Sequence, residues 1–412
     1  MSCCVFRINR TFTATNIGLG ILSLLSILTP AFADQFDTVN YIGSIGVNYD
    51  NNVFRLPEGV DPQIVLGKPS KSDFTNFVSF GVNIDKKYSN QGLVFNLTGT
   101  KLQYRNFSHL DHTSSSYKGA WNWQISSQFK GGLNFTRAQT LNNPADTKLY
   151  TRNLNTVDNI GLNGNWMLGS RLFMTFGVSN DKVTNSTNSI NNLGSHSSTN
   201  EWGFKYEPVQ GKSIQLISRY LKANNSNQTP NPISLIDTGS KENQFEAKAV
   251  WNITGKSFLS ANLIDTDHRN FNFSQRDYKG TQGGVNYNLS MSGKTSMNIS
   301  LLRSLNTWWD DASSYYVSDN ILISPQWQVD SKIITYVKLN YGNNDYRGAV
   351  KSGMPVRHDV THSMLLGMDW SPQRALTISA SIQHSSRTTI PTTYAGYNCS
   401  DNTASLSVQA NF

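Results

Sequence analysis

Alternation of apolar and polar residues is the sequence feature that most constrains the fold of this chain. The segment 404–412 reads Ala-Ser-Leu-Ser-Val-Gln-Ala-Asn-Phe, so every even position is apolar and every odd position is polar. A period of two places successive side chains on opposite faces of a β-strand. The segments 172–178, 245–253, 333–341 and 376–382 carry an apolar stripe with the same period. The sequence therefore predicts strands with one apolar face and one polar face.

The number and spacing of these segments predict a closed barrel. We count about 18 of them, an even number that suits a single-chain bacterial barrel with both termini on the periplasmic side. Their expected centres lie near positions 44, 79, 97, 119, 133, 161, 175, 203, 217, 248, 261, 284, 300, 323, 337, 366, 380 and 406. The connections alternate between short turns (167–171, 254–256, 330–332) and longer polar loops (179–198, 222–241, 265–276, 343–359). Short periplasmic turns and longer extracellular loops are typical of such barrels.

The low hydropathy of the chain agrees with this fold. Its mean hydropathy is −0.40, and no run of 18 apolar residues follows Ala33, which argues against helical spans. In a barrel only alternate residues face lipid, so a polar composition is expected. The predicted fold class is all-β, a transmembrane antiparallel β-barrel of about 18 strands in contact with outer-membrane lipids.

The N-terminus has the form of a cleaved signal peptide. Arg7 and Arg10 precede an apolar run, 17–28, and Ala31-Phe32-Ala33 provides the small residues of a cleavage site. The run would make roughly 18 Å of helix, too short for a hydrocarbon core of about 30 Å. We expect residues 1–33 to be removed with Cys3 and Cys4, and residues 34–412 to form a single outer-membrane barrel domain. Cys399 is then the remaining cysteine, which leaves no pair for an internal disulfide.

Aromatic residues gather near the expected strand ends, as in the interfacial girdles of membrane barrels. The alternative is the core of a soluble β-sandwich, which would need a second sheet over each apolar stripe. The C-terminal Phe412 ends an alternating strand, the form read by the barrel-assembly machinery, and is the predicted assembly signal. The aromatic residues concerned are Trp121, Trp123, Trp166, Trp202, Trp251, Trp327, Trp370, Tyr315 and Tyr316.

Residues on the polar face of each strand are expected to line the lumen. The chain has 35 basic and 27 acidic residues, a mild excess that does not imply nucleic acid as a partner. The inward charges lean basic, which suits passage of an anionic or neutral glycan. By alternation the predicted lumen-facing residues are Lys118, Arg171, Lys205, Arg219, Lys248, Lys338, Glu201, Glu246 and Asp369.

The enzyme-like motifs are weak. The segment 236–240, Ile-Asp-Thr-Gly-Ser, resembles half of an aspartic-protease site, but the second Asp-Thr/Ser-Gly that this chemistry requires is missing. The segment 265–268, Asp-Thr-Asp-His, begins like a calcium loop and does not continue as one. The segment 308–311, Trp-Trp-Asp-Asp, fits a sugar-stacking site or an interfacial aromatic pair. We predict that the protein is not an enzyme and has no cofactor or metal site.

The segment following the first strand carries a family resemblance. It is similar to the Tyr-Asp-Asp-Asn-Leu-Phe-Arg-Leu-Pro stretch of EpsL-type outer-membrane proteins, which are encoded in exopolysaccharide biosynthesis operons of bacteria with an exosortase system. This sequence departs from the stretch at Asn51 and Val53. The matching residues are Tyr49, Asp50, Asn51, Asn52, Val53, Phe54, Arg55, Leu56 and Pro57.

The resemblance implies a barrel that helps an exopolysaccharide cross the outer membrane, with periplasmic polysaccharide-export proteins as possible partners. It carries over no catalytic residues. A general porin for small solutes, or a surface-binding barrel, is the alternative. Asx turns at the Asp-Asn-Asn run would end the first strand. The loop that follows could either fold back on the barrel rim or narrow the lumen.

Overall fold

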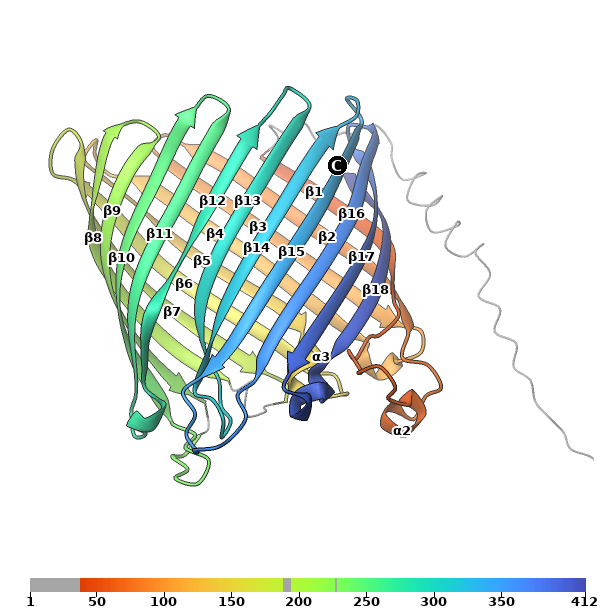
Figure 1. Ribbon diagram of the computed structural model, residues 1–412. Coiled ribbons are helices and arrows are strands. Elements are labelled where there is room, and N and C mark those ends of the chain that lie inside the picture. The colour runs from red at the N-terminus through yellow and green to blue at the C-terminus, as the bar shows by residue number, and fades with distance from the viewer. Residues whose placement is uncertain (1–37, 188–193, 227) are drawn as a thin grey trace, which may run out of the picture.

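The protein forms a closed antiparallel barrel of 18 strands (Figure 1). The structure is a computed structural model that describes residues 38–187, 194–226 and 228–412. Each strand pairs with its neighbours in sequence, and β1 pairs with both β2 and β18, which closes the sheet. The predicted fold class is confirmed. The predicted signal peptide, 1–33, lies outside the described residues.

Each of the predicted strand centres falls within an observed strand. Two short helices, α2 (Pro62–Leu66) and α3 (Pro144–Thr147), and three 3-10 helices, η1 (Ser108–Leu110), η2 (Ser274–Arg276) and η3 (Thr392–Tyr397), lie in the connections. The strands are β1 (Val39–Asp50), β2 (Asp73–Tyr88), β3 (Gln91–Tyr104), β4 (His112–Gln124), β5 (Phe129–Leu141), β6 (Leu154–Met167), β7 (Leu172–Asn185), β8 (Ser195–Val209), β9 (Lys212–Asn225), β10 (Gly239–Thr254), β11 (Ser257–Asn270), β12 (Tyr278–Ser290), β13 (Thr295–Thr307), β14 (Tyr315–Gln328), β15 (Ile333–Arg347), β16 (His358–Gln373), β17 (Leu376–Ile390) and β18 (Cys399–Asn411).

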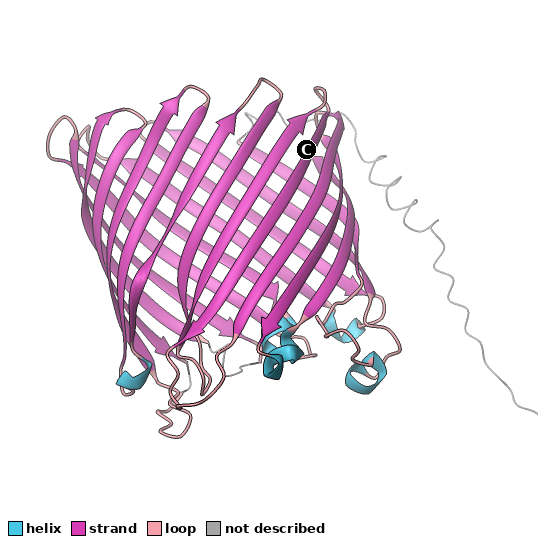
Figure 2. Cartoon of the chain, viewed as in Figure 1, coloured by secondary structure: helices cyan, strands magenta, loops and turns pink. Residues whose placement is uncertain are grey.

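The two ends of the barrel differ in their connections. Short turns and the C-terminus lie at one end, and the longer loops with their helices lie at the other (Figure 2). The short end is therefore periplasmic and the loop end extracellular. The long loops are shorter than predicted, because β7, β9, β11 and β15 continue to residues 185, 225, 270 and 347. Ladder hydrogen bonds extend these strands beyond the point where the outward face stops being apolar.

The outward face of the sheet is apolar and exposed. Val78 is 59% exposed, Leu263 62% and Leu406 50%, and each lies on the face that leaves the barrel. A water-soluble protein does not expose an apolar belt around its whole girth, whereas a closed barrel with such a belt satisfies every backbone group inside a bilayer. The chain is thus a transmembrane β-barrel of the bacterial outer membrane. No described helix is long and apolar enough to span a membrane.

Aromatic side chains mark the periplasmic rim of this belt. Trp166, Trp251, Trp327 and Trp370 lie near the short turns and are between 39% and 53% exposed, as interfacial aromatics are. Closure of the barrel excludes the sandwich alternative, because all 18 strands belong to one closed sheet. Tyr315 and Tyr316 lie instead near the extracellular loops, where each contacts another aromatic ring.

The end of the chain completes the barrel seam. The backbone N–H of Tyr41 donates to the carbonyl of Phe412 at 2.6 Å, and the N–H of Phe412 donates back at 2.9 Å. The two rings are stacked with centroids 6.3 Å apart. The role of Phe412 as the signal for the barrel-assembly machinery stays a prediction.

Candidate functional site

The inner wall of the barrel is lined largely by amide and hydroxyl side chains. On β5, β6 and β7, Asn134 donates to Asn159 at 3.1 Å, and Asn159 donates to Asp181 at 2.6 Å. Such ladders run across neighbouring strands on the face opposite the apolar belt. Further inward pairs are Thr100–Ser79, Gln215–Thr175, Asn262–Glu246, Gln282–Thr266, Asn298–Asn286 and Ser405–Asn48. The surface that faces the lumen is therefore polar and mostly uncharged.

A charged cluster interrupts this lining on β8, β9 and β10. The guanidinium of Arg219 donates to Glu201 at 3.1 Å and to Glu246 at 3.0 Å, and its third hydrogen bond goes to Gln244 at 2.9 Å. Glu246 is 6% exposed. Planar guanidinium groups suit this multiple recognition of carboxylates. The cluster fixes the positions of three charges that would otherwise move freely in the lumen.

The other predicted lumen residues make no hydrogen bond to this cluster among the contacts of the described residues. Lys205 pairs with Glu207 at 2.9 Å, and the Nζ of Lys338 lies 5.6 Å from the centre of the Tyr336 ring. Lys118, Lys248 and Asp369 lie on the same inward face, opposite Thr136, Gln215 and Ile334 respectively. Arg171 differs from the rest, because it lies in the periplasmic turn 168–171 and not in a strand. The alternation rule does not apply to its side chain, since a turn breaks the period of two.

The segment that carries the family resemblance folds into a buried turn at the extracellular rim. Asn52 is fully buried: its side chain accepts from the N–H of Leu56 at 2.8 Å and donates to the carbonyls of Leu56 and Ser400. Arg55 pairs with Asp50 at 2.8 Å and with Asp401 on β18 at 3.2 Å. The turn is thus tied across the seam of the barrel.

The apolar residues of this segment anchor it to a neighbouring loop. Phe54 and Leu56 are 2% and 1% exposed and pack against Phe107 and Leu110 of the loop between β3 and β4. The Phe54 and Phe107 rings meet edge to face at 4.9 Å. These contacts hold the loop on the rim, as the first of the two alternatives for it requires.

The loop end also contains a repeated module that the sequence analysis missed. The motif Asn-Phe-Ser-x-x-Asp occurs at residues 106–111 and again at residues 272–277. In both copies a 3-10 helix, η1 or η2, follows the Phe, and the final Asp accepts a backbone N–H from seven residues earlier, at 2.7 Å. The sequence signal was the repeat itself, which strand periodicity does not reveal.

A buried carboxylate from another segment locks each copy in place: Asp73 begins β2, and Asp237 lies in the loop between β9 and β10. The carboxylate of Asp73 accepts the backbone N–H groups of Asn106 and Phe107, both at 2.8 Å. In the second copy Asp237 accepts those of Asn272 and Phe273, at 2.6 and 3.1 Å. Both carboxylates belong to fully buried residues. We call Asp73 and Asp237 the latch residues of the two modules.

The aspartic-protease-like motif is thereby accounted for, because Asp237 is a latch residue. Burial would raise the pKa of Asp237, but the hydrogen bonds from Asn272, Phe273 and Thr238 outweigh it and lower the pKa below its ordinary value. A carboxylate with a lowered pKa is suited to hold backbone N–H groups and unsuited to share a proton with a second carboxylate.

The other two chemical motifs do not assemble into sites. Asp265 and Asp267 lie on the outward face of β11, whereas Thr266 and His268 lie on the inward face, so the four cannot converge on one ion. Trp308 is 7% exposed and its ring N–H donates to Asp310 at 2.8 Å, so it is packed within the loops and not presented to a sugar. Within the described part of the chain, no three His, Cys, Asp or Glu side chains could hold a metal ion together.

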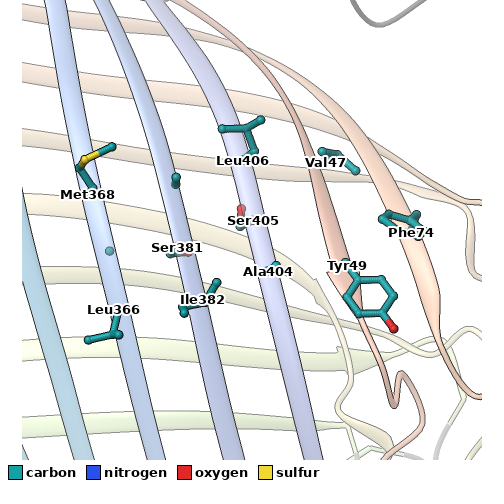
Figure 3. Close-up of a pocket in the computed structure, with 12 residues that line it drawn as sticks. Val47, Tyr49, Phe74, Leu366, Met368, Ser381, Ile382, Ala404, Ser405 and Leu406 are labelled. Carbon is teal, nitrogen blue, oxygen red and sulfur yellow. The ribbon is translucent and has the colours of Figure 1, made fainter. Parts of the chain in front are cut away.

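A shallow groove of about 480 Å³ lies on the outer wall near the barrel seam (Figure 3). It lies where small residues, Ala380 and Ala404, interrupt the bulky belt of β16, β17, β18, β1 and β2. Its larger side chains point away from the lumen, so lipid covers it and it is not part of a solute path. The larger side chains that line it are Val47, Tyr49, Phe74, Leu366, Met368, Ile382 and Leu406.

Comparison with protein-family models and with curated proteins finds no match for this chain. Solved structures that resemble it include the outer membrane protein OpdK from Pseudomonas aeruginosa, at 11% identity over 91% of this chain and 98% of that chain, with a TM-score of 0.48. OpdQ from the same organism has 11% identity over 91% and 97%, with a TM-score of 0.49. The siderophore receptor PirA from P. aeruginosa has 10% identity over 92% and 81%, with a TM-score of 0.42. The outer-membrane assignment rests on the barrel geometry itself.

Proposed function

We propose that this barrel is a passive channel for hydrophilic and largely uncharged solutes. The observation that carries the proposal is the amide and hydroxyl lining of the inner wall, in which the main charged cluster, Glu201–Arg219–Glu246, is internally paired. Barrels of 16 to 18 strands enclose an aqueous channel. A lumen that offers hydrogen bonds without a strong net field favours neutral polar molecules over either sign of ion.

Reconstitution into planar bilayers and liposomes tests the channel. We expect steady conductance with weak ion selectivity, and swelling of liposomes in neutral sugars that falls as sugar size rises. Replacing Lys118, Arg219 and Lys248 by Glu should shift the reversal potential toward cation selectivity, because inward anions repel anions in a confined channel. Absence of conductance and of sugar uptake through the folded wild-type barrel would refute the proposal.

A matched control separates the lumen from the net charge of the protein. Lys101, Lys182 and Arg303 lie on the outward face, opposite Val78, His196 and Gly283. Their replacement by Glu changes the net charge by the same amount and should leave the reversal potential unchanged. An equal shift in both variants would mean that selectivity does not come from the predicted lumen residues.

A second candidate function is passage of an exopolysaccharide. It is favoured by the segment 49–57, which resembles the EpsL-type stretch and whose Asn52, Phe54 and Leu56 are buried at the loop end of the barrel. An uncharged, hydrogen-bonding wall also suits a glycan chain. In this case periplasmic polysaccharide-export proteins would deliver the polymer to the barrel.

Deletion of the gene distinguishes the two candidates. A conduit predicts that secreted exopolysaccharide falls while intracellular or periplasmic glycan accumulates, because synthesis does not need the barrel and exit does. A general channel predicts unchanged polymer and slower uptake of small sugars. Unchanged polymer secretion would eliminate the conduit and leave the channel proposal standing.

A further inference from the structure

A row of like charges crosses the outside of the barrel near its extracellular end. Lys241 on β10 lies directly opposite Lys222 on β9 and directly opposite Arg269 on β11. All three side chains are exposed on the face that carries Phe245, the outward residue of β10 that is 56% exposed. Side chains directly opposite in an antiparallel pair have Cβ atoms about 5 Å apart, where like charges destabilise the sheet.

The carboxylates nearby are too few to neutralise the row. Asp267 pairs with Arg269 at 3.0 Å and also with Lys279 on β12 at 2.8 Å. Asp265 lies one step closer to the apolar belt, opposite Phe245 and Thr281. Asp277, just before β12, also acts electrostatically on Arg269, so four cations face three carboxylates and the row keeps a positive excess. The side chains of Arg269 and Lys279 are 62% and 69% exposed, so they remain accessible from outside.

Two other cations on the outward face each have a carboxylate of their own. Arg303 binds Asp319 through two hydrogen bonds of 2.7 and 2.8 Å, and Arg347 pairs with Asp345 at 2.6 Å. The basic row, defined as Lys222, Lys241, Arg269 and Lys279, therefore differs from these neutralised pairs in needing an external anion.

The position of the basic row indicates which anion is available. Lys241 lies four residues beyond Phe245 toward the loops, a height of about 9 Å for a strand tilted by about 45°. This is the level of the headgroups just above the apolar belt. The Nζ atoms of Lys222 and Lys241 lie 5.9 and 5.8 Å from the centre of the Phe271 ring, and aromatic rings are typical of the same interface.

We propose that the basic row binds the phosphate groups of the anionic glycolipid in the outer leaflet. Phosphate oxygens would accept hydrogen bonds from Lys222, Lys241 and Arg269 together and relieve their mutual repulsion. The acyl chains of the same lipid would lie along the apolar belt below, against Phe245 and Leu263. Recognition by a short cluster of Lys and Arg beside a membrane is an established mode of binding to anionic lipid.

Native mass spectrometry of the folded barrel in neutral detergent tests this proposal. The probes are bisphosphorylated lipid A, phosphatase-treated lipid A and inorganic phosphate. We expect the wild-type barrel to bind bisphosphorylated lipid A at least tenfold more tightly than the treated lipid, and to show no retained inorganic phosphate. Equal binding of the two lipids, or retention of inorganic phosphate in place of lipid, would overturn the proposal without any variant.

A charge-matched pair of variants locates the site. Replacing Lys222, Lys241 and Arg269 by Gln should weaken binding of bisphosphorylated lipid A at least tenfold and leave channel conductance unchanged. The control replaces Lys256, Lys294 and Lys332 by Gln, which removes the same charge from the periplasmic turns. It should alter lipid binding less than twofold. Equal losses in both variants would show that net charge alone attracts the lipid, and the basic row would have no role.

Discussion

Two extracellular loops share one backbone arrangement but bury different side chains. One connects β3 to β4, and the other connects β11 to β12. Both use the Asn-Phe-Ser-x-x-Asp motif, a 3-10 helix and a buried latch carboxylate. In the first module Leu110, 1% exposed, packs against Phe54, Leu56 and Phe107. In the second module the equivalent position is Arg276, which is buried to 2% exposure. The same backbone thus accommodates an apolar side chain in one place and a guanidinium in the other.

The guanidinium of Arg276 is stabilised by carbonyl groups. It donates to the backbone oxygens of Ser313, Ser234 and Asp310, each at 3.0 Å, and the ring of Trp309 lies 5.3 Å away. Burial lowers the pKa of Arg276, and the charges of Asp310 and Asp311 partly oppose this. Burial of a charge is tolerated only where hydrogen bonds replace its hydration.

The buried side chain, Leu110 or Arg276, determines what each module requires from its neighbours. The first module is stabilised by apolar burial, which requires only that neighbouring side chains fill space. The second requires two other loops at fixed distances, since the loop between β9 and β10 supplies the carbonyl of Ser234 and the loop between β13 and β14 supplies those of Asp310 and Ser313. The first should therefore tolerate conservative apolar changes, and the second should tolerate almost none.

Exchanging the buried side chains of the two modules should give the largest loss of local stability. Leu110→Arg buries a charge without acceptors and should destabilise the first loop by about 4 kcal/mol. Arg276→Leu removes one donor from each of three carbonyls and should destabilise the second by about 3 kcal/mol. Hydrogen exchange of the loop amides measures both. The melting of the barrel itself should change little, because the strand ladders do not involve these side chains.

Ile233, which is 88% exposed in the loop between β9 and β10, provides the control. Ile233→Arg should leave loop exchange unchanged, since its guanidinium stays in water. Wild-type protection in Leu110→Arg would contradict the view that the first module depends on apolar burial.

Substitution of either latch residue should reduce the local stability of its module by the same amount, because the two modules share this carboxylate contact. Asp73→Asn and Asp237→Asn each replace a carboxylate that accepts two N–H groups of the next loop by a neutral amide with a single acceptor oxygen. We expect a loss of about 2 kcal/mol of local stability in each, because hydrogen bonds to charged groups contribute about 1.5 to 3 kcal/mol. Exchange of the amides at 106 and 107, and at 272 and 273, reports the two modules separately. A large loss in one module alone would show that the two latches are not equivalent.

Acid should release the second latch with a smaller effect. The pKa of Asp237 is lower in the folded loop than in an unfolded chain. Ionisation therefore contributes stability that is complete above the unfolded pKa, near about 3.9, and is lost as the pH falls through the folded pKa. Pepsin should cleave the loop at 226–238 only at the acidic end of a series from pH 5 to pH 2. In Asp237→Asn this pH dependence should be weaker, and an unchanged profile would point to other carboxylates.

The strands were predicted correctly where one face of a segment contacts lipid and the other face contacts water. Lipid on one side and water on the other impose a period of two, and the alternation at 404–412 and 245–253 records it directly. The strand ends were missed where this contrast fades. Residues 265–270 lie beyond the apolar belt and have charged or polar side chains on both faces, so they looked like loop, although β11 continues to Asn270.

The assembly of the inner charges could not be predicted from alternation alone. Alternation indicates the face of a residue but not its neighbours across strands. Arg219 meets Glu201 and Glu246 because the register places Glu201 directly opposite it on β8 and Glu246 two residues beyond its direct partner on β10. Register depends on turn geometry and on hydrogen bonding along whole strands, so one slipped residue would separate the three charges.

Local contrasts between apolar and polar residues were sufficient to predict the class of fold, the approximate number of strands and which face of each strand meets lipid. The roles of Asp73, Asp237 and Arg276 follow only from contacts made in the folded protein. A charged residue in a polar loop looks exposed when it is read alone. Here distant loops enclose each of them and supply hydrogen-bond partners in place of water, and that exchange depends on contacts between residues far apart in the chain.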